Sequence, residues 1–167
     1  HEVLPGIRRE HPTVEFVVVG TAPSEPVERL ARREGIRVTG YVEDPAAYLA
    51  RAKVVVAPMR YGTGIQNKVL EGMAVGRPVV TTPLGLTGID AEPGEHLVVA
   101  DGARETVEAV SDLLVDPSRR RELGTAAGRL VRERYTWDAV GHRLNEVVRG
   151  VLVADGTETA NGERRAQ

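Results

Sequence analysis

The stretch that decides the fold is residues 60–78, which read RYGTGIQNKVLEGMAVGRP. It follows the apolar run Lys53–Ala57, which has the continuous β-branched pattern of a strand covered on both faces and is ended by Pro58. Over Asn67–Val75 the apolar residues recur with helical spacing, and Gly76 follows as a helix stop signal. A strand, a glycine-bearing loop and a helix in this order predict one βα unit of a parallel α/β sheet.

The loop and the first turns of this helix carry residue types that suit a diphosphate. Gly62 and Gly64 let the backbone approach a ligand closely, and the start of the helix offers free N–H groups and the positive end of its dipole. Lys68 adds a positive charge in the first turn, and the carboxylate of Glu71 can accept hydrogen bonds from a pair of sugar hydroxyls. The same residues also fit a surface helix in which Lys68 and Glu71 pair at i, i+3, so local chemistry leaves both interpretations open.

The rest of the chain repeats the alternation of strands and helices. Apolar runs predict strands at residues 14–19, 36–39, 53–57, 78–82 and 96–100. Helical spacing and capping signals predict helices at residues 1–10, 26–35, 45–52, 67–75, 103–115, 118–134 and 137–152. This alternation implies right-handed βαβ units and a parallel sheet, whose ligands bind beyond the carboxyl ends of the strands. Residues 153–167 are small, polar and charged, and they predict a disordered tail.

The composition excludes several classes of protein. The chain has 167 residues, a net charge of −2 and no cysteine, so disulfide scaffolds and cysteine-ligated metal sites are ruled out. The balanced charge argues against nucleic acid as a partner, and aromatic residues, at 4%, are too few for a surface that stacks sugars or bases. No apolar run approaches the roughly 20 residues of a membrane span, and the four histidines show no metal-ligand spacing. We therefore expect a cytoplasmic protein without a metal site.

Residues 60–78 resemble the hallmark of the group 1 glycosyltransferases, a family with the two-domain GT-B fold that uses nucleotide-sugar donors. The matching positions are Gly62, Gly64, Asn67–Glu71, Met73, Ala74, Gly76 and Pro78–Thr81. Supporting matches lie along the chain at Pro12–Gly20, Gly35–Asp44, Gly85–Ile89 and Tyr135–Trp137. Together they cover about residues 3–152, in order and with compatible spacing.

The resemblance implies a Rossmann-like parallel sheet with helices on both faces, which forms the C-terminal half of a GT-B enzyme and lacks its first strand. Residues 1–152 would form a donor-binding domain that is incomplete at its N-terminal side, followed by the tail at 153–167. The N-terminal half of such an enzyme, which binds the acceptor and closes the cleft, would be a missing partner domain. We therefore expect this chain alone to be inactive in sugar transfer.

The resemblance also implies roles for single residues. Glu71 would bind the ribose hydroxyls, Gly64 and Ile65 would lie against the diphosphate and the donor sugar, and Tyr41 and Val42 would lie beside the base. Neighbouring residues complete the predicted donor site: Arg60, Gly62, Thr63, Gln66 and Lys68. Many relatives carry a glutamate that contacts the donor sugar where this chain has Thr63, so the identity of the sugar stays open. No catalytic residue is assigned, because the acceptor half is not in this chain.

The function that the resemblance implies is transfer of a sugar from a nucleoside diphosphate sugar to an acceptor, in polysaccharide or glycolipid biosynthesis. The reaction would retain the configuration of the sugar and use neither a metal nor a cofactor, since the donor is a substrate and no Asp-x-Asp motif occurs. A lipid-linked acceptor would bring the protein to the inner face of a membrane. Two alternatives are a non-catalytic nucleotide-binding or protein-interaction domain and a GT-B domain like those of NDP-sugar 2-epimerases. The oligomeric state is left open.

Overall fold

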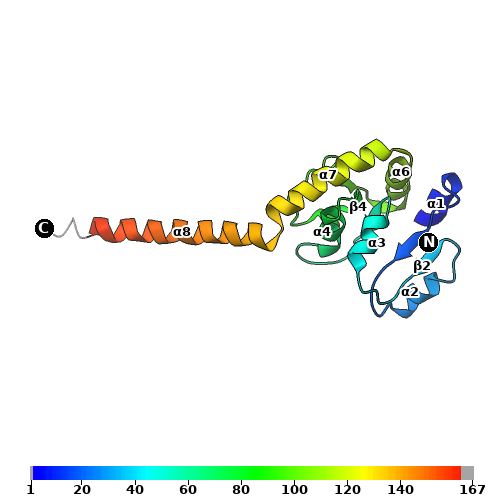
Figure 1. Cartoon of the computed structure of the whole chain (residues 1–167), viewed down its shortest axis with the longest axis horizontal. Helices are drawn as coiled ribbons and strands as arrows, with labels where there is room; N and C mark the ends of the chain where they lie inside the picture. The colour runs from blue at the N-terminus through cyan, green and yellow to red at the C-terminus, as the bar shows by residue number, and fades with distance from the viewer. Residues whose placement is uncertain (1, 163–167) are drawn as a thin grey trace. The chain divides into compact units, whose positions relative to one another are not determined.

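The computed structural model describes residues 2–162 and shows an α/β protein (Figure 1). The chain divides into two compact units, residues 1–130 and residues 131–167, and each is described by itself. The elements follow one another in the order α1 Val3–Glu10, β1 Phe16–Val18, α2 Glu25–Leu30, β2 Ile36–Val38, α3 Pro45–Arg51, β3 Val55–Ala57, α4 Asn67–Ala74, β4 Val79–Thr81, α5 Pro83–Leu86, β5 Val98–Val99, α6 Gly102–Val115, α7 Pro117–Arg134 and α8 Trp137–Gly162. This order confirms the predicted fold class.

The five strands form two parallel sheets rather than one continuous sheet. The first sheet pairs β1 with β2, and Phe16 lies opposite Ile36. The second has the order β3-β4-β5, with Val55 opposite Val79 and Val80 opposite Val98. Every pairing is parallel, as predicted. Among the described residues, no hydrogen-bonded ladder joins β1 to β3.

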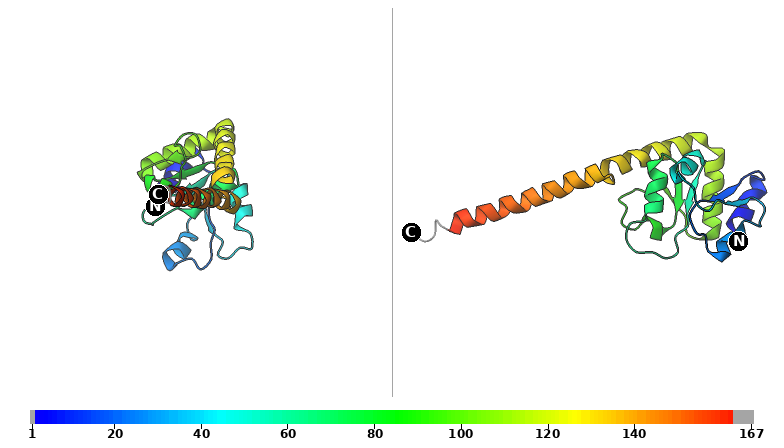
Figure 2. Two further views of the ribbon diagram at one scale, coloured as in Figure 1. Left: turned by 90° about the vertical axis from the view of Figure 1, so that its left-hand side faces the viewer. Right: turned by 60° about the horizontal axis from the view of Figure 1, so that its bottom comes forward.

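Helices cover both faces of the three-stranded sheet. Neighbouring residues of β4 point to opposite sides of the sheet, so Val79 and Val80 show which helices lie on each face. On one side α4 packs so closely that a Cβ atom on Gly72 would lie 2.9 Å from Val79 Cγ2. On the other side Val80 joins a buried cluster with Ile7 of α1 and Val110 of α6. Figure 2 shows the strands between these helices, and α1 contacts α6 while α3 contacts α4.

The core of the first unit lies around the three-stranded sheet. Met73, Val79 and Leu97 are fully buried. Residues of β1 and β2 are only half-buried or exposed, and Phe16 is 37% exposed. The apolar core therefore supports the strand and the helix that flank the glycine loop.

Several boundaries differ from the prediction. Helix α2 ends at Leu30, not at Gly35; four exposed residues in turns and bends follow it, and Gly35 makes a left-handed turn (φ 77°) into β2. The four-residue helix α5 was not predicted as a helix, and the Thr82 side chain caps it. Helix α8 continues past residue 152 to Gly162, so residues 153–162 are helical where the sequence predicted a disordered tail. Residues 163–167 lie outside the described residues.

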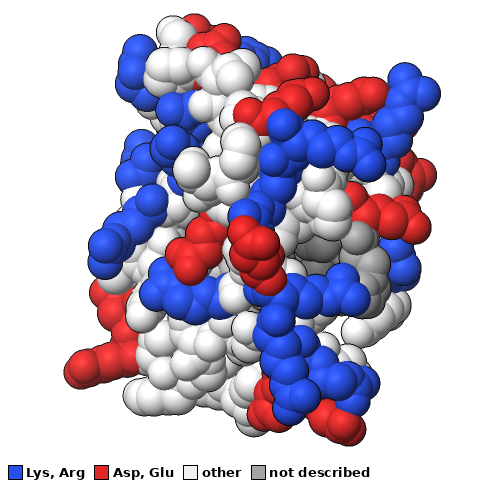
Figure 3. All heavy atoms as spheres, turned by 90° about the vertical axis from the view of Figure 1, so that its right-hand side faces the viewer, with Lys and Arg blue, Asp and Glu red and all other residues white. Residues whose placement is uncertain are grey.

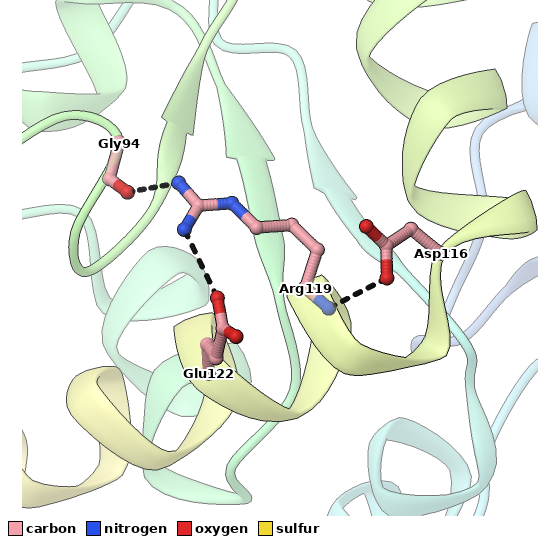
Figure 4. Close-up of polar contacts among 4 residues, drawn as sticks. All are labelled: Gly94, Asp116, Arg119 and Glu122. Carbon is pink, nitrogen blue, oxygen red and sulfur yellow. Dashed lines mark hydrogen bonds and ion pairs between the residues drawn. The ribbon is translucent and has the colours of Figure 1, made fainter.

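Charged side chains of both signs are mixed on the surface. Figure 3 shows Lys and Arg interspersed with Asp and Glu on one face of the molecule. Arg119 at the start of α7 bonds the carbonyl of Gly94 and pairs with Glu122, and its backbone N–H donates to the Asp116 carboxylate at 2.9 Å (Figure 4). Arg120 donates to two carbonyls near the end of α6. These arginines hold α7 in place within the first unit.

No helix in the described part of the chain is long and apolar enough to cross a membrane.

Candidate functional site

The candidate site lies in the loops that follow β3 and β4, where both parallel strands have their carboxyl ends. The β3 loop runs over residues 58–66 into α4, and the β4 loop contains α5. The carboxyl edge of a parallel sheet is where ligands of open α/β proteins bind. The structure therefore brings the predicted glycine loop to the expected edge of the sheet.

Two threonines tie these loops together. Thr81 Oγ1 donates to the carbonyl of Ala57 at 2.8 Å, and Thr82 Oγ1 donates to the carbonyl of Met59 at 2.7 Å. Helix α5 lies so close that a Cβ atom on Gly85 would be 2.0 Å from Thr81 Oγ1. The two hydroxyls therefore hold the start of the β3 loop and are engaged within the protein.

The glycine loop is also fixed at its far end. Gly62 (φ 148°) and Gly64 (φ 69°) have backbone conformations that other residues rarely adopt. Ile65 lies against Gly88, where a Cβ atom would be 3.1 Å from Ile65 Cγ1. Gln66 Nε2 donates to the carbonyl of Gly64 at 3.0 Å. The loop has a defined shape because its own residues and the β4 loop brace it.

Helix α4 begins directly after this loop with no side chain capping its N-terminus. Its first N–H groups therefore have no side-chain acceptor, and they carry the positive end of the helix dipole. Lys68 and Glu71 are both exposed on the first turns. The pairing between them that the sequence left open is not formed, and neither has an ion pair within residues 2–162. A cation, the N–H groups of Asn67 and Lys68 and a carboxylate thus lie on the first turns of one short helix, where the N–H of Val69 bonds the carbonyl of Gln66.

The remaining predicted residues surround the loop or lie on the other sheet. Arg60, Tyr61 and Thr63 are exposed, and Arg60 has no ion pair in the part of the chain that the structure describes. Tyr41 is 76% exposed and precedes the half-buried Val42. Both follow β2, so no strand pairing fixes their distance from the glycine loop.

The sequence missed the internal roles of Thr81, Thr82 and Gly88 in shaping this site. Two threonines at the end of a strand before a proline are a recognisable capping signal, and Gly88 was matched only through the resemblance. Among residues 2–162, no group of three or more His, Asp or Glu residues could hold a metal ion.

Comparison with known proteins identifies the family of this chain. The family model for "Glycosyl transferases group 1" matches residues 1–116. The chain belongs to the group 1 glycosyltransferases. This glycosyltransferase domain is 31% identical over 162 residues to a GDP-mannose-dependent α-(1-6)-phosphatidylinositol monomannoside mannosyltransferase of Mycolicibacterium smegmatis, an alignment that covers 88% of this chain and 42% of the relative.

Solved structures share the fold. Sucrose-phosphate synthase from Thermosynechococcus elongatus has a TM-score of 0.74 at 24% identity, over 92% of this chain and 42% of its own. The C-terminal domain of a group 1 glycosyltransferase (LpcC) from Francisella tularensis has a TM-score of 0.68 at 18% identity, over 81% of this chain and 77% of its own. The glycosyltransferase domain spans about two fifths of the curated relatives it matches. These matches agree with the C-terminal half of a GT-B enzyme.

Proposed function

We propose that this domain binds the nucleoside diphosphate part of a sugar donor at the start of α4, and that the whole protein transfers the sugar to an acceptor. The observation that carries the proposal is the exposed, unpaired Lys68 at the uncapped N-terminus of α4, directly behind a braced glycine loop. The GDP-mannose dependence of the mycobacterial relative supports a nucleotide-sugar donor.

In the proposed mechanism the chain stabilises the leaving diphosphate. As the bond to the sugar breaks, negative charge grows on the diphosphate. The N–H groups of α4 and the ammonium of Lys68 lie at one end of a fixed helix, and such preorganised groups lower the energy of that charge without rearrangement. Glu71, one turn further, accepts hydrogen bonds from the two ribose hydroxyls. Tyr41 and Val42 contact the base, and the backbone at Gly64 and Ile65 lies along the diphosphate.

The proposal extends to the whole protein. A second domain binds the acceptor, which we propose is a glycolipid or a lipid-linked sugar at the inner face of a membrane; the phosphatidylinositol acceptor named for the relative supports this. Transfer retains the configuration of the sugar and uses no metal or cofactor. The isolated domain binds the donor but does not transfer the sugar.

A titration of the chain with GDP and UDP tests the donor site. We expect one of them to bind, and we expect Lys68→Ala and Glu71→Ala each to weaken binding about tenfold or more, because each removes a hydrogen bond to a charged group. Lys53→Ala is the matched control, since the other lysine of the chain is also exposed but precedes β3 at the amino edge of the sheet. A folded chain that binds neither nucleotide, or equal losses in the Lys53 and Lys68 variants, would contradict the proposal.

We also propose that the donor-binding domain includes one more parallel strand, between β1 and β3. Helix α1 packs on α6, which covers β4 on the face that Val80 occupies. A right-handed crossover that enters β1 through α1 starts from a strand beside β1, on the side away from β2. Both neighbouring edges are unpaired among the described residues, and parallel sheets are normally covered and continuous.

Amide hydrogen exchange tests for this strand. The N–H of Phe16 bonds β2 and that of Val55 bonds Pro78, so the alternate amides of Val17 and Val56 point to the open edges. Adding a short valine-rich segment with a flexible linker before residue 1 should protect Val17 and Val56 and leave Phe16 and Val55 unchanged. A Val56→Pro variant, which removes an outward-facing donor of β3 and restricts φ there, should lower the protection of Val17. Unchanged exchange at Val17 and Val56 in the extended chain would refute the proposed strand.

A further inference from the structure

The side chain of Gln66 lies back across its own loop. Its Nε2 atom donates to the carbonyl of Gly64 at 3.0 Å. Its carboxamide also fills the space beside Gly62, where a Cβ atom would lie 2.9 Å from Nε2 and 3.3 Å from Cδ. The amide group therefore touches the loop at two points, and the absence of a side chain at Gly62 makes room for it.

The backbone of Gln66 has a separate task. Gln66 is the N-cap residue of α4, and its carbonyl accepts from the N–H of Val69 at 2.9 Å. Its side chain does not cap the helix. One residue thus joins the first turn of α4, through its backbone, to the glycine loop, through its side chain.

The loop needs such a brace. Gly62 and Gly64 give the loop more accessible backbone conformations than residues with a side chain would, and holding them in one conformation costs conformational entropy. Ile65 packs against Gly88. Gly62 and Gly64 have positive φ angles, and among the described residues the Gln66 side chain is the group that lies beside Gly62 and bonds the carbonyl of Gly64.

We propose that Gln66 is a positioning residue that holds the Gly62–Gln66 loop in its nucleotide-binding conformation and does not itself contact the ligand. This rests on the proposed donor site at α4, and it replaces the expectation that Gln66 binds the donor directly. One of the two N–H groups of its side chain is already used by the carbonyl of Gly64 in the free protein, and this bond turns the carboxamide back toward the loop. When the binding-competent loop is only partly populated, the apparent affinity falls by that fraction.

Binding kinetics separate the two roles. Losing a ligand contact mainly raises the dissociation rate. Losing a brace lowers the share of molecules that can bind, so the apparent association rate falls and the dissociation rate stays the same. The variant Gln66→Met keeps the length of the side chain and removes its N–H donor. Gln66→Ala removes both.

The test is stopped-flow binding of whichever nucleotide, GDP or UDP, binds the native chain, combined with backbone NMR relaxation of the free protein. We expect Gln66→Met to lower the apparent association rate about fivefold, the loss that one net hydrogen bond brings, with an unchanged dissociation rate. The order parameters of the Gly64 and Ile65 backbone should fall in the free variant, while the midpoint of thermal unfolding stays the same. The exposed Asn145→Met serves as the control for the substitution itself.

Other outcomes overturn the inference in distinguishable ways. A faster dissociation with an unchanged association rate would make Gln66 a ligand contact. Unchanged order parameters at Gly64 in the free Gln66→Met protein would show that the side chain does not hold the loop, whatever the nucleotide data. If the native chain binds neither nucleotide while the order parameters respond as expected, the structural role of Gln66 stands, and the donor site, with the ligand-binding role built on it, fails.

Discussion

Val80 of β4 and Val18 of β1 are the same residue type in parallel strands, yet their surroundings differ. Val80 is 1% exposed and lies between two layers of helices. Val18 is only half-buried, in a sheet of two strands. The glycine loop and α4 are built on the buried sheet, whereas Tyr41 and Val42 extend from the exposed one. The helix proposed to bind the diphosphate is therefore packed on a buried sheet. The residues proposed to contact the base follow a two-stranded sheet with less buried surface.

The largest expected difference in the free energy of unfolding is between variants of the helices that pack on the two sheets. Met73 of α4 is fully buried, so Met73→Ala should lower the free energy of unfolding by about 3 kcal/mol through lost burial and a cavity. Leu30 of α2 is only half-buried beside β2, and Leu30→Ala should cost less than about 1.5 kcal/mol. Urea unfolding of both variants measures this. Equal losses would remove the distinction between the two sheets.

Valine-to-alanine variants in the two sheets should show the same contrast in the free energy of unfolding, with smaller losses. Val80→Ala removes two methyl groups from a closed core and should cost about 2 kcal/mol. Val18→Ala should cost about half as much or less, because much of its surface is in water already. Denaturation curves at one temperature compare the two variants directly, and a larger loss for Val18 would contradict the burial.

Two threonines offer a matched test of buried and local hydrogen bonds. Thr81 Oγ1 bonds the Ala57 carbonyl across two strands and is buried, while Thr39 Oγ1 bonds the carbonyl of the next residue, Gly40. Thr81→Val should cost about 1 kcal/mol, because one buried hydrogen bond is lost while the Ala57 carbonyl keeps its bond from the N–H of Met59. Thr39→Val should be close to neutral. Thermal unfolding of the two variants tests this, and a neutral Thr81→Val would mean that the bond from Met59 alone satisfies the Ala57 carbonyl.

The smallest effect expected concerns the contact between α1 and the start of β2. Arg8 pairs with Glu34 at 2.6 Å and bonds the carbonyl of Pro12 at 3.2 Å. Glu34 is exposed, so Arg8→Ala should cost about 0.5 kcal/mol at low salt, less in high salt. Glu34→Gln, which leaves the bond to Pro12, should cost still less. A loss that does not change with salt would mean that Arg8 acts through packing over Gly35 and not through its charge.

The sequence predicted the elements of the buried sheet well because their signals are local. The apolar run before Pro58, the Asp44 cap of α3 and the stop at Gly76 all appear in the structure within a few residues of their predicted places. In the candidate site, Lys68 and Glu71 follow from their spacing on one helix. These features depend on neighbours in the chain.

The sequence could not predict what depends on packing between distant segments. No pattern within β1 or β3 reveals the break between them, where we propose one more strand; only the resemblance to a family pointed to a missing strand. The contacts of Gln66 are local, but its residue type does not say whether the side chain turns outward or back onto Gly62 and Gly64, as it does in the structure. The bonds of the Thr81 and Thr82 hydroxyls to the carbonyls of Ala57 and Met59 join segments more than 20 residues apart, and no local pattern predicts them.

The exposure of Trp137 has a practical consequence for optical work on this protein. It is the only tryptophan, it is 88% exposed, and it begins α8 outside the first unit. Indole emission responds to the water around the ring, which changes little here when the β-sheet core unfolds. Tryptophan fluorescence is therefore a poor probe of that core, and far-ultraviolet circular dichroism is the better choice. Tyr41 and Tyr61, exposed beyond β2 and β3, make tyrosine emission the intrinsic signal to follow when nucleotide is added.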